Sequence, residues 1–175
     1  MPLYLFGLML VWLAGCSPHQ HEPAFLEPPA TAVLPVLDFR QDRLSSPASW
    51  VDNPMIAGML SQKGYHVVFI SESVSAEEAT DLPSVPRPRL KALGPSNARW
   101  LILPMLYEVR RTASLQSAYT ATCAGQLYDK LEQQIVWRES LRYQELAGGD
   151  IQGQWRRGVA QGCFRQLLKQ LPDRT

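Results

Sequence analysis

Hydrophobic and polar positions repeat with different periods along the chain, and these periods predict its elements. Residues 32–39 form a short, mostly apolar run typical of a strand buried on both faces, and Pro35 within it indicates an edge or a bulge. An Asn-Pro pair at residues 53–54 then opens a helix whose apolar residues recur at helical spacing as far as Gly64, the expected residue just past its end. Residues 65–70 are β-branched and aromatic and predict a second strand.

The next segment is rich in proline, and its signals are local. Ser75 and Glu78 have the spacing of a capping box, and residues 89–93 fit a short helix that ends before Gly94. Three longer strands follow, with short polar connections that predict an antiparallel meander. They cover residues 100–109, 115–128 and 134–144.

Simple alternation in the last of these strands places Ile135 and Trp137 on the same face. Residues 151–171 then show an apolar residue at every fourth position, Cys163 among them, which predicts a helix that packs one face on the sheet. The order is therefore β-α-β, a three-stranded meander and a closing helix. This order predicts an α/β (α+β) fold with a single mixed sheet and the C-terminal helix packed on it.

An uninterrupted apolar run over residues 2–13 precedes Cys16. A dozen apolar residues are too few to span a bilayer, which needs ~20, and small residues at the end of the run are typical of a signal-peptide cleavage site. The four residues 13–16 (LAGC) resemble the lipobox of bacterial lipoproteins, in which the cysteine is diacylated and the chain is cut just before it. The resemblance implies a signal peptide over residues 1–15 and an anchor of acyl chains such as palmitate on Cys16. No Lys or Arg precedes the run, which favours a true start upstream.

Residues 16–31 combine the expected lipidated cysteine with a Pro-rich stretch that has too little apolar surface to fold, so a tether is expected there. The remaining residues, 32–175, fit a single domain. Ser17 stands where an aspartate favours inner-membrane retention in enteric lipoproteins, so the resemblance implies a protein anchored in the outer membrane and facing the periplasm.

Charge and cysteine content narrow the possible partners. The 17 Lys and Arg residues nearly cancel the 16 Asp and Glu residues, so no overall field favours nucleic acid.

With Cys16 used by the anchor, Cys123 and Cys163 form an even pair in an oxidising compartment. Both a structural disulfide and two separate buried thiols are compatible with this pair. The disulfide is the prediction, because the small neighbours Ala121 and Gly125 would let the closing helix approach the strand that carries Cys123.

A search for catalytic motifs finds no Ser-x-x-Lys pair, nucleophile elbow, zinc helix or phosphate loop. His19 and His21 lie in the tether, where two ligands make a poor metal site, and His66 is the only histidine of the domain. The sequence therefore predicts a protein that is not an enzyme and that needs neither a cofactor nor a metal ion. A hydrolase acting on wall or lipid stays an alternative, which a pocket with polar groups around His66 would favour.

Three features together resemble small periplasmic lipoproteins of curli secretion and of peptidoglycan-synthase activation, which share a domain like the N-terminal domain of TolB. They are the lipobox with its tether, the junction at residues 60–67 (LSQKGYHV) that leads from helix to strand, and the hairpin from Asp129 to Trp137. Gln133 stands where such hairpins have glycine, so the turn is expected to be made differently. The resemblance implies an α/β domain over residues 32–171 that works through protein contacts.

We therefore expect a membrane-anchored binding or assembly factor for an envelope complex, with a periplasmic or outer-membrane protein as partner. The alternative is a subunit of an oligomeric secretion or transport apparatus. The expected partner surface is the loop over residues 40–52, because ligand sites of α/β sheets favour the carboxyl ends of strands. Its candidate contacts are Arg40, Arg43 and Trp50, since Arg and Trp are enriched at interface hot spots. Trp50 could instead fold back over the helix start.

Overall fold

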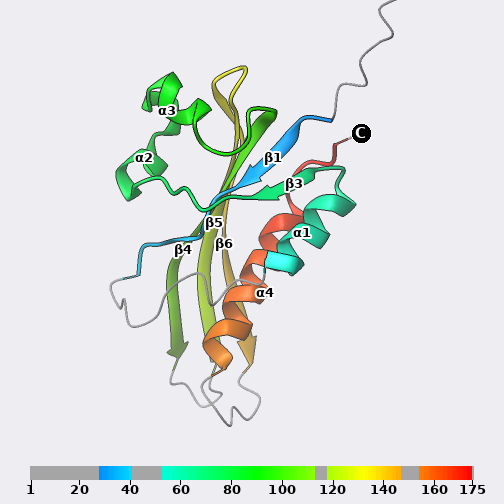
Figure 1. The fold of residues 1–175 in the computed structure, drawn as a ribbon. Helices are drawn as coiled ribbons and strands as arrows, with labels where there is room; N and C mark the ends of the chain where they lie inside the picture. Colours follow the sequence, from blue (N-terminus) through cyan, green and yellow to red (C-terminus); the bar gives the residue numbers. More distant parts are fainter. Residues whose placement is uncertain (1–27, 41–52, 113–117, 147–153, 175) are drawn as a thin grey trace, which may run out of the picture.

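The computed structural model describes residues 28–40, 53–112, 118–146 and 154–174 (Figure 1). Three sequence predictions lie outside these residues: the signal peptide with the lipid anchor on Cys16, the tether up to residue 27, and the loop that carries Arg43 and Trp50.

Six strands of the described part form one mixed sheet, as the sequence predicted. The order is β3-β1-β4-β5-β6, with the short β2 also paired to β4. Strand β1 runs parallel to both β3 and β4, whereas β4, β5 and β6 form the predicted antiparallel meander. The strands are β1 (Ala30–Val33), β2 (Leu37–Asp38), β3 (His66–Phe69), β4 (Ala98–Thr112), β5 (Ala118–Asp129) and β6 (Gln134–Leu146).

The first predicted strand differs from the observed one. It starts at Ala30, two residues earlier than expected, and it is split into β1 and β2 around Pro35. Pro35 contributes to the split, because proline has no N–H for the ladder. The chain nevertheless follows β4: Leu34 N–H donates to the Ile102 carbonyl (2.9 Å), and Leu37 then pairs with Met105. Because β1 lies between β3 and β4, it is not an edge strand.

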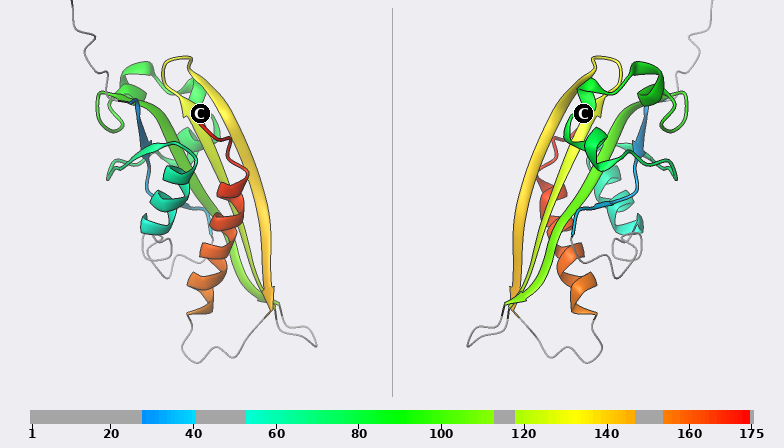
Figure 2. Two further views of the ribbon diagram at one scale, coloured as in Figure 1. Left: turned by 90° about the vertical axis from the view of Figure 1, so that its right-hand side faces the viewer. Right: turned by 90° about the vertical axis from the view of Figure 1, so that its left-hand side faces the viewer.

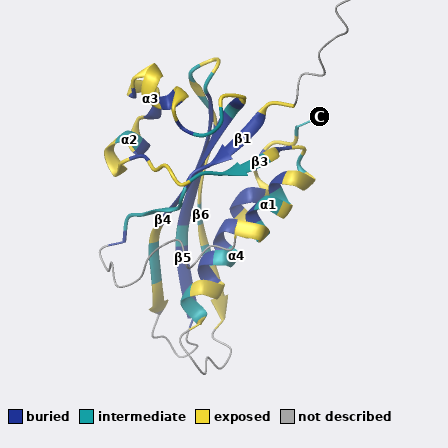
Figure 3. Cartoon of the chain, in the orientation of Figure 1, coloured by how far each residue is buried: buried dark blue, intermediate teal, exposed yellow. Residues whose placement is uncertain are grey.

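Helices cover both faces of the sheet (Figures 1 and 2). One face packs against α1 (Asn53–Gln62) and the closing helix α4 (Trp155–Lys169), whose buried side chains belong to one apolar cluster with β4 and β5. The second cluster, on the other face, includes side chains of α2 (Ala76–Thr80), the 3-10 turn η2 (Leu82–Ser84) and α3 (Arg87–Lys91). Both clusters combine buried residues of the strands with buried residues of the helices, and Figure 3 colours buried residues dark blue.

Helix ends follow the sequence signals. Gly64 adopts a left-handed φ of 82° just past α1, where its N–H donates to the Ser61 carbonyl and the Tyr65 N–H donates to the Leu60 carbonyl (both 3.0 Å). This pair of bonds is a Schellman motif, which satisfies carbonyls at the helix end. The capping box also forms: Glu78 N–H donates to Ser75 Oγ (3.0 Å), and Ser75 N–H donates to Glu78 Oε2 (2.8 Å).

Within the meander, one predicted face assignment is wrong. Trp137 packs with α4, but Ile135 packs in the cluster on the opposite face. The reason is a bulge, because Leu127 pairs with Trp137 and the next residue, Tyr128, pairs with Ile135. The pairing skips Val136, so the alternation changes sides at that point.

A disulfide joins Cys123 of β5 to Cys163 of α4, with a Cα–Cα distance of 6.2 Å. Both cysteines are fully buried in the cluster between the sheet and α4. Gly125, two residues along the same face of β5, leaves room for Trp137 and for Leu167 of α4: a Cβ built there would lie 2.8 Å from the indole and 3.3 Å from the leucine. Close packing of helix and strand at this point depends on the absent side chain.

Candidate functional site

The expected partner surface begins at Arg40, and the structure places this side chain inside. Arg40 is 7% exposed, and its guanidinium donates to both carboxylate oxygens of Asp38, with a distance of 2.7 Å from Nε to Oδ1. The guanidinium of Arg40, which was expected to contact a partner, is therefore paired with Asp38 of the same chain. Arg43 and Trp50 lie outside the described residues, so the contacts assigned to them stay predictions.

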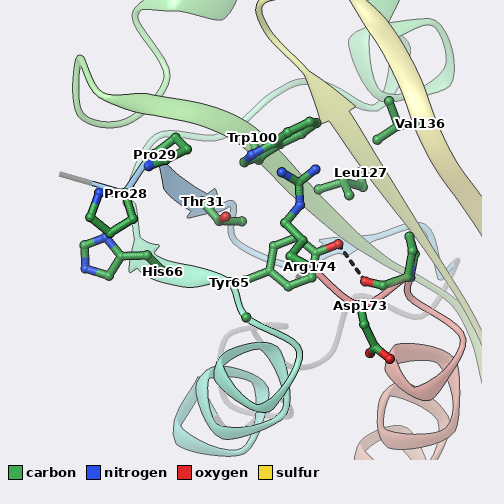
Figure 4. Close-up of a pocket in the computed structure, with 12 residues that line it drawn as sticks. Pro28, Pro29, Thr31, Tyr65, His66, Trp100, Leu127, Val136, Asp173 and Arg174 are labelled. Atoms are coloured by element: carbon green, nitrogen blue, oxygen red, sulfur yellow. Dashed lines mark hydrogen bonds between the residues drawn. The ribbon is translucent and has the colours of Figure 1, made fainter. Parts of the chain in front are cut away.

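A different region has the geometry of a binding site. A cavity of about 500 Å³ opens where the chain enters β1, beside the C-terminal tail, residues 171–174 (Figure 4). We call this cavity the tail pocket. Its wall combines aromatic, apolar and polar side chains from β1, β3, β4, the β5–β6 hairpin and the tail. The lining residues are Pro28, Pro29, Thr31, Gly64, Tyr65, His66, Trp100, Leu127, Val136, Pro172, Asp173 and Arg174.

Hydrogen bonds from the α1–β3 junction hold the tail that forms one side of this pocket. Lys63 Nζ donates to the Leu171 carbonyl (2.7 Å) and to Asp173 Oδ1 (2.8 Å), and the Lys63 carbonyl accepts from Arg174 N–H (2.7 Å). Tyr65 Oη donates to the Pro172 carbonyl (2.9 Å), the bond that is dashed in Figure 4. The ends of two distant elements, α1 and α4, are thereby fixed to each other.

Gly64 is the residue that lets the tail pass so close. A Cβ at this position would lie 2.1 Å from the Arg174 carbonyl oxygen, a backbone atom that cannot move away cheaply. Its φ of 82° is also a conformation that side chains disfavour. The same glycine therefore ends α1 and admits the tail.

The tail places a cation on an aromatic wall. Arg174 Cζ lies 3.2 Å from the centroid of the Trp100 ring and 5.1 Å from that of Tyr65, and Figure 4 shows the guanidinium between the two rings. These distances are those of a cation–π contact. Arg99 Cζ lies 4.5 Å from the Trp100 ring as well, so two guanidinium groups contact one indole.

Three polar atoms of this wall are buried without a hydrogen-bond partner among the described residues: Thr31 Oγ1, Trp100 Nε1 and Arg174 Nε. Thr31 is 1% exposed and Trp100 is 5% exposed. The two residues are register partners on β1 and β4, so their side chains lie on the same face of the sheet. Buried polar groups are normally satisfied, because leaving one unpaired costs about 1–3 kcal/mol. Three together in one pocket indicate a place where water or a ligand supplies the partners.

Arg99, which contacts the Trp100 ring, is held by an ion pair with Asp129. Arg99 Nη2 donates to Asp129 Oδ2 (2.8 Å), and Asp129 Oδ1 accepts from the N–H groups of Leu131 (2.8 Å) and Glu132 (3.2 Å). Burial favours the neutral acid, but the hydrogen bonds from Arg99, Glu132 and Leu131 outweigh it and lower the pKa of Asp129. The hydrogen bond to Asp129 in turn raises the pKa of Arg99. Arg99 and Asp129 are thus both charged, and they link the strand of Trp100 to the β5–β6 turn.

His66 lines the pocket, as the hydrolase alternative required, but the pocket does not pair it with a nucleophile. Thr31, the one Ser, Thr or Cys in the lining, has no hydrogen-bond partner among the described residues, so its hydroxyl is not activated by the imidazole. Tyr65 uses its hydroxyl to hold Pro172. The pocket therefore has the groups of a binding site.

A second cavity of about 600 Å³ lies on the opposite face, between α2 and the meander. Gln126 forms part of its wall, donates through Nε2 to the Ala79 carbonyl (3.1 Å), and has no hydrogen-bond partner at Oε1 in the described part of the chain. This cavity has one unpaired acceptor where the tail pocket has three unpaired polar groups.

Within the described ranges, no three His, Cys, Asp or Glu side chains gather in the way that metal ligands do. No helix in those ranges is both long enough and apolar enough to cross a membrane.

No family model and no curated protein sequence matches the chain. Solved structures do match. The PelC L103M dodecamer from Paraburkholderia phytofirmans is 15% identical, with a TM-score of 0.54 over 83% of this chain and 88% of that one. The hypothetical protein CT253 from Chlamydia trachomatis is 15% identical, with a TM-score of 0.51 over 80% and 91%. Lipoprotein GNA1162 from Neisseria meningitidis is 18% identical, with a TM-score of 0.49 over 81% and 99%.

At these identities the comparison concerns the fold alone. The chain shares its fold with PelC and with CT253, two bacterial proteins. The finer resemblance to the TolB N-terminal domain and to curli-secretion lipoproteins stays a prediction.

Sequence reasoning identified Lys63, Gly64 and Tyr65 as a helix-to-strand junction, but not as the support of a site. It missed Trp100, read only as a strand residue, and Arg174. Nothing in the pattern marks a C-terminal arginine as functional, because its role depends on a tail that folds back across more than a hundred residues of sequence.

Proposed function

We propose that the protein is a lipoprotein anchored through Cys16 in the outer membrane, facing the periplasm, and that it acts as a non-enzymatic binding or assembly factor of the cell envelope. The observation that carries this proposal is the LAGC motif behind a short apolar run. The Pro-rich stretch after Cys16 leads directly to Pro28 and Pro29, which line the tail pocket. Two or more acyl chains are sufficient for stable attachment, at ~0.8 kcal/mol per buried CH₂.

The anchor is tested by Cys16→Ser. Wild-type protein should incorporate labelled palmitate, shift in size when globomycin blocks processing, and fractionate with outer membranes. The variant should lose the label and stay unprocessed or soluble in the periplasm. A wild-type protein that takes up no palmitate and is processed normally in globomycin would contradict the lipoprotein assignment.

The partner is proposed to be a periplasmic or outer-membrane protein that contacts the loop over residues 40–52 through Arg43 and Trp50. Crosslinking in intact cells, followed by capture of the protein, tests this. Trp50→Ala should reduce the captured partner while the melting temperature stays close to that of the wild type. If the melting temperature falls steeply instead, Trp50 packs on the domain and the loop is not the docking surface.

A second function, that of a subunit in an oligomeric secretion or transport apparatus, is favoured by one observation. The PelC structure that shares this fold is a dodecamer. Light scattering on the protein purified in a neutral detergent distinguishes the two functions. A ring or another stable oligomer would favour the apparatus subunit, whereas a monomer favours the binding factor.

A further inference from the structure

We propose that the tail pocket is a binding site for a small monocarboxylate with an apolar body. The proposal concerns this pocket alone and does not depend on the lipid anchor or on the partner loop, so its test can fail or succeed separately from theirs. It rests on four properties of the pocket: its unpaired groups, its charge, its walls and its rigidity.

The unpaired groups are mainly donors. Trp100 Nε1 and Arg174 Nε can only donate, and Thr31 Oγ1 can donate or accept. In Figure 4 the indole nitrogen of Trp100 is on the edge of the ring turned toward Thr31 and Pro29. A ligand that satisfies all three must therefore be rich in acceptors. A carboxylate has two oxygens with about four lone-pair positions, which matches this set.

Charge selects a monoanion. Arg174 carries one positive charge, and no ion pair joins it to a carboxylate among the described residues. The one acidic side chain of the lining, Asp173, is already paired with Lys63 (2.8 Å). One negative charge would balance Arg174, whereas a dianion such as hydrogen phosphate would leave a charge unpaired in a partly buried site, which is unfavourable.

Most of the remaining wall is apolar, and His66 adds an imidazole to it. Pro28 and Pro29 lie at the entrance, and Leu127 and Val136 lie on the side of the hairpin, while the rings of Tyr65 and Trp100 offer flat surfaces. A volume of about 500 Å³ is within the range of small-molecule sites. The pocket therefore has room for a carboxylate with an apolar body of at least one aromatic ring.

The donors are held in place before any ligand arrives. The four hydrogen bonds between the α1–β3 junction and the tail fix Arg174 against Trp100, and the strand pairing of β1 with β4 fixes Thr31 beside it. Binding then needs little additional ordering of side chains, which is the usual advantage of a preorganised site.

The test uses the protein as it is purified from cells in a neutral maltoside detergent, whether or not it carries acyl chains, labelled with ¹⁵N at the tryptophan indoles. The Trp100 indole signal is identified by its loss in Trp100→Phe. Sodium benzoate should shift this signal, with a dissociation constant on the order of a millimolar for so small a probe. Benzamide has the same ring and no charge. At equal concentration it should change the chemical shift of this signal at least tenfold less than benzoate does.

The variants separate the pocket from general charge effects. Benzoate binding, measured by calorimetry, should weaken by about tenfold in Trp100→Phe, which keeps an aromatic ring and removes one donor, and by at least as much in Arg174→Gln. Arg165→Gln removes the same charge from an exposed position on α4 and should bind like the wild type. Arg174 lies on the tail outside the helices and strands, so its variant also serves if Trp100→Phe does not fold.

Three results would overturn the proposal. One is a Trp100 signal that does not move when the benzoate concentration is about 50 times the expected dissociation constant of ~1 mM. Another is binding that does not depend on charge, seen either as equal affinities for benzamide and benzoate or as equal benzoate affinities of Arg174→Gln and the wild type. The third is a site that takes inorganic phosphate with the same dependence on Trp100 and Arg174 but does not take benzoate, because the ligand would then be a different anion.

Discussion

Gln133, at the turn between β5 and β6, adopts a sterically unfavourable backbone conformation that the surrounding structure stabilises. Its φ is 56°, a left-handed conformation that glycine adopts at no steric cost and that other residues disfavour. The expectation that this turn differs from that of related hairpins stays a prediction. Asp129 stabilises the turn by accepting the N–H groups of Leu131 and Glu132.

Gln133→Gly should therefore stabilise the protein. Removing the Cβ relieves a steric cost of ~1–2 kcal/mol, and the greater freedom of glycine in the unfolded chain offsets part of it, so we expect a gain of ~0.5–1 kcal/mol in urea unfolding. Gln134→Gly is the matched control, since it makes the same change one residue later, inside β6, where it should cost ~0.5–1 kcal/mol. A loss of stability in Gln133→Gly would contradict this account of the turn.

The carboxylate of Asp129 predicts a dependence of stability on pH. Its pKa is lowered below the ordinary 3.8 in the folded protein, so the unfolded chain binds the proton more tightly. Its contribution is therefore present above pH 3.8 and is lost as the pH falls through the lowered pKa.

Urea midpoints measured from pH 6 down to pH 2 test this dependence. The difference between the wild type and Asp129→Asn should shrink once the pH falls below about 4. Glu145→Gln, which removes an exposed carboxylate from β6, is the matched control. A constant difference for Asp129→Asn would show that its ionisation does not contribute to stability.

At the scale of elements, the main contact is that of α4 with the meander, and small residues set how close it is. Gly125 of β5 faces Trp137 and Leu167, both buried, so a side chain there has no space to enter. Gly158 lies on the exposed side of α4 with nothing within 4 Å of its Cβ position.

The same substitution at these two positions should have opposite effects. Gly125→Ala should lower the free energy of unfolding by ~1–3 kcal/mol, because the indole of Trp137 or the side chain of Leu167 must move out of a packed cluster. Gly158→Ala should raise it by up to ~1 kcal/mol through helix propensity. Thermal melting of the two variants beside the wild type is sufficient, and stabilisation by Gly125→Ala would show that the helix is not held this close.

At the scale of the whole molecule, the disulfide ties the sheet to the closing helix across 40 residues of sequence. In the chain-entropy model a loop of this length contributes ~3–4 kcal/mol, so the variant in which both Cys123 and Cys163 are alanine should be less stable by about that amount. Mass spectrometry of non-reduced protein from the periplasm should find neither cysteine as a free thiol. Two free thiols in that protein, or unchanged stability in the double variant, would contradict the disulfide.

The sequence by itself determined the elements and their order, because these depend on local signals: the periods of apolar residues, the glycine after α1, the capping box of α2 and the turn residues of the meander. Where it failed, a non-local pairing decided the outcome. The break around Pro35 depends on how β2 meets β4, and the change of face at Ile135 depends on a bulge against β5.

The candidate site belongs almost wholly to the tertiary structure. Thr31, Trp100 and Arg174 come from the start, the middle and the end of the chain, and no short-range pattern relates them. Strand pairing brings Thr31 to Trp100, and the tail that Lys63 and Tyr65 hold brings Arg174 onto the indole. The sequence contains the motif for the membrane anchor within four consecutive residues, whereas the pocket exists only once the chain has folded, because its groups act together through space.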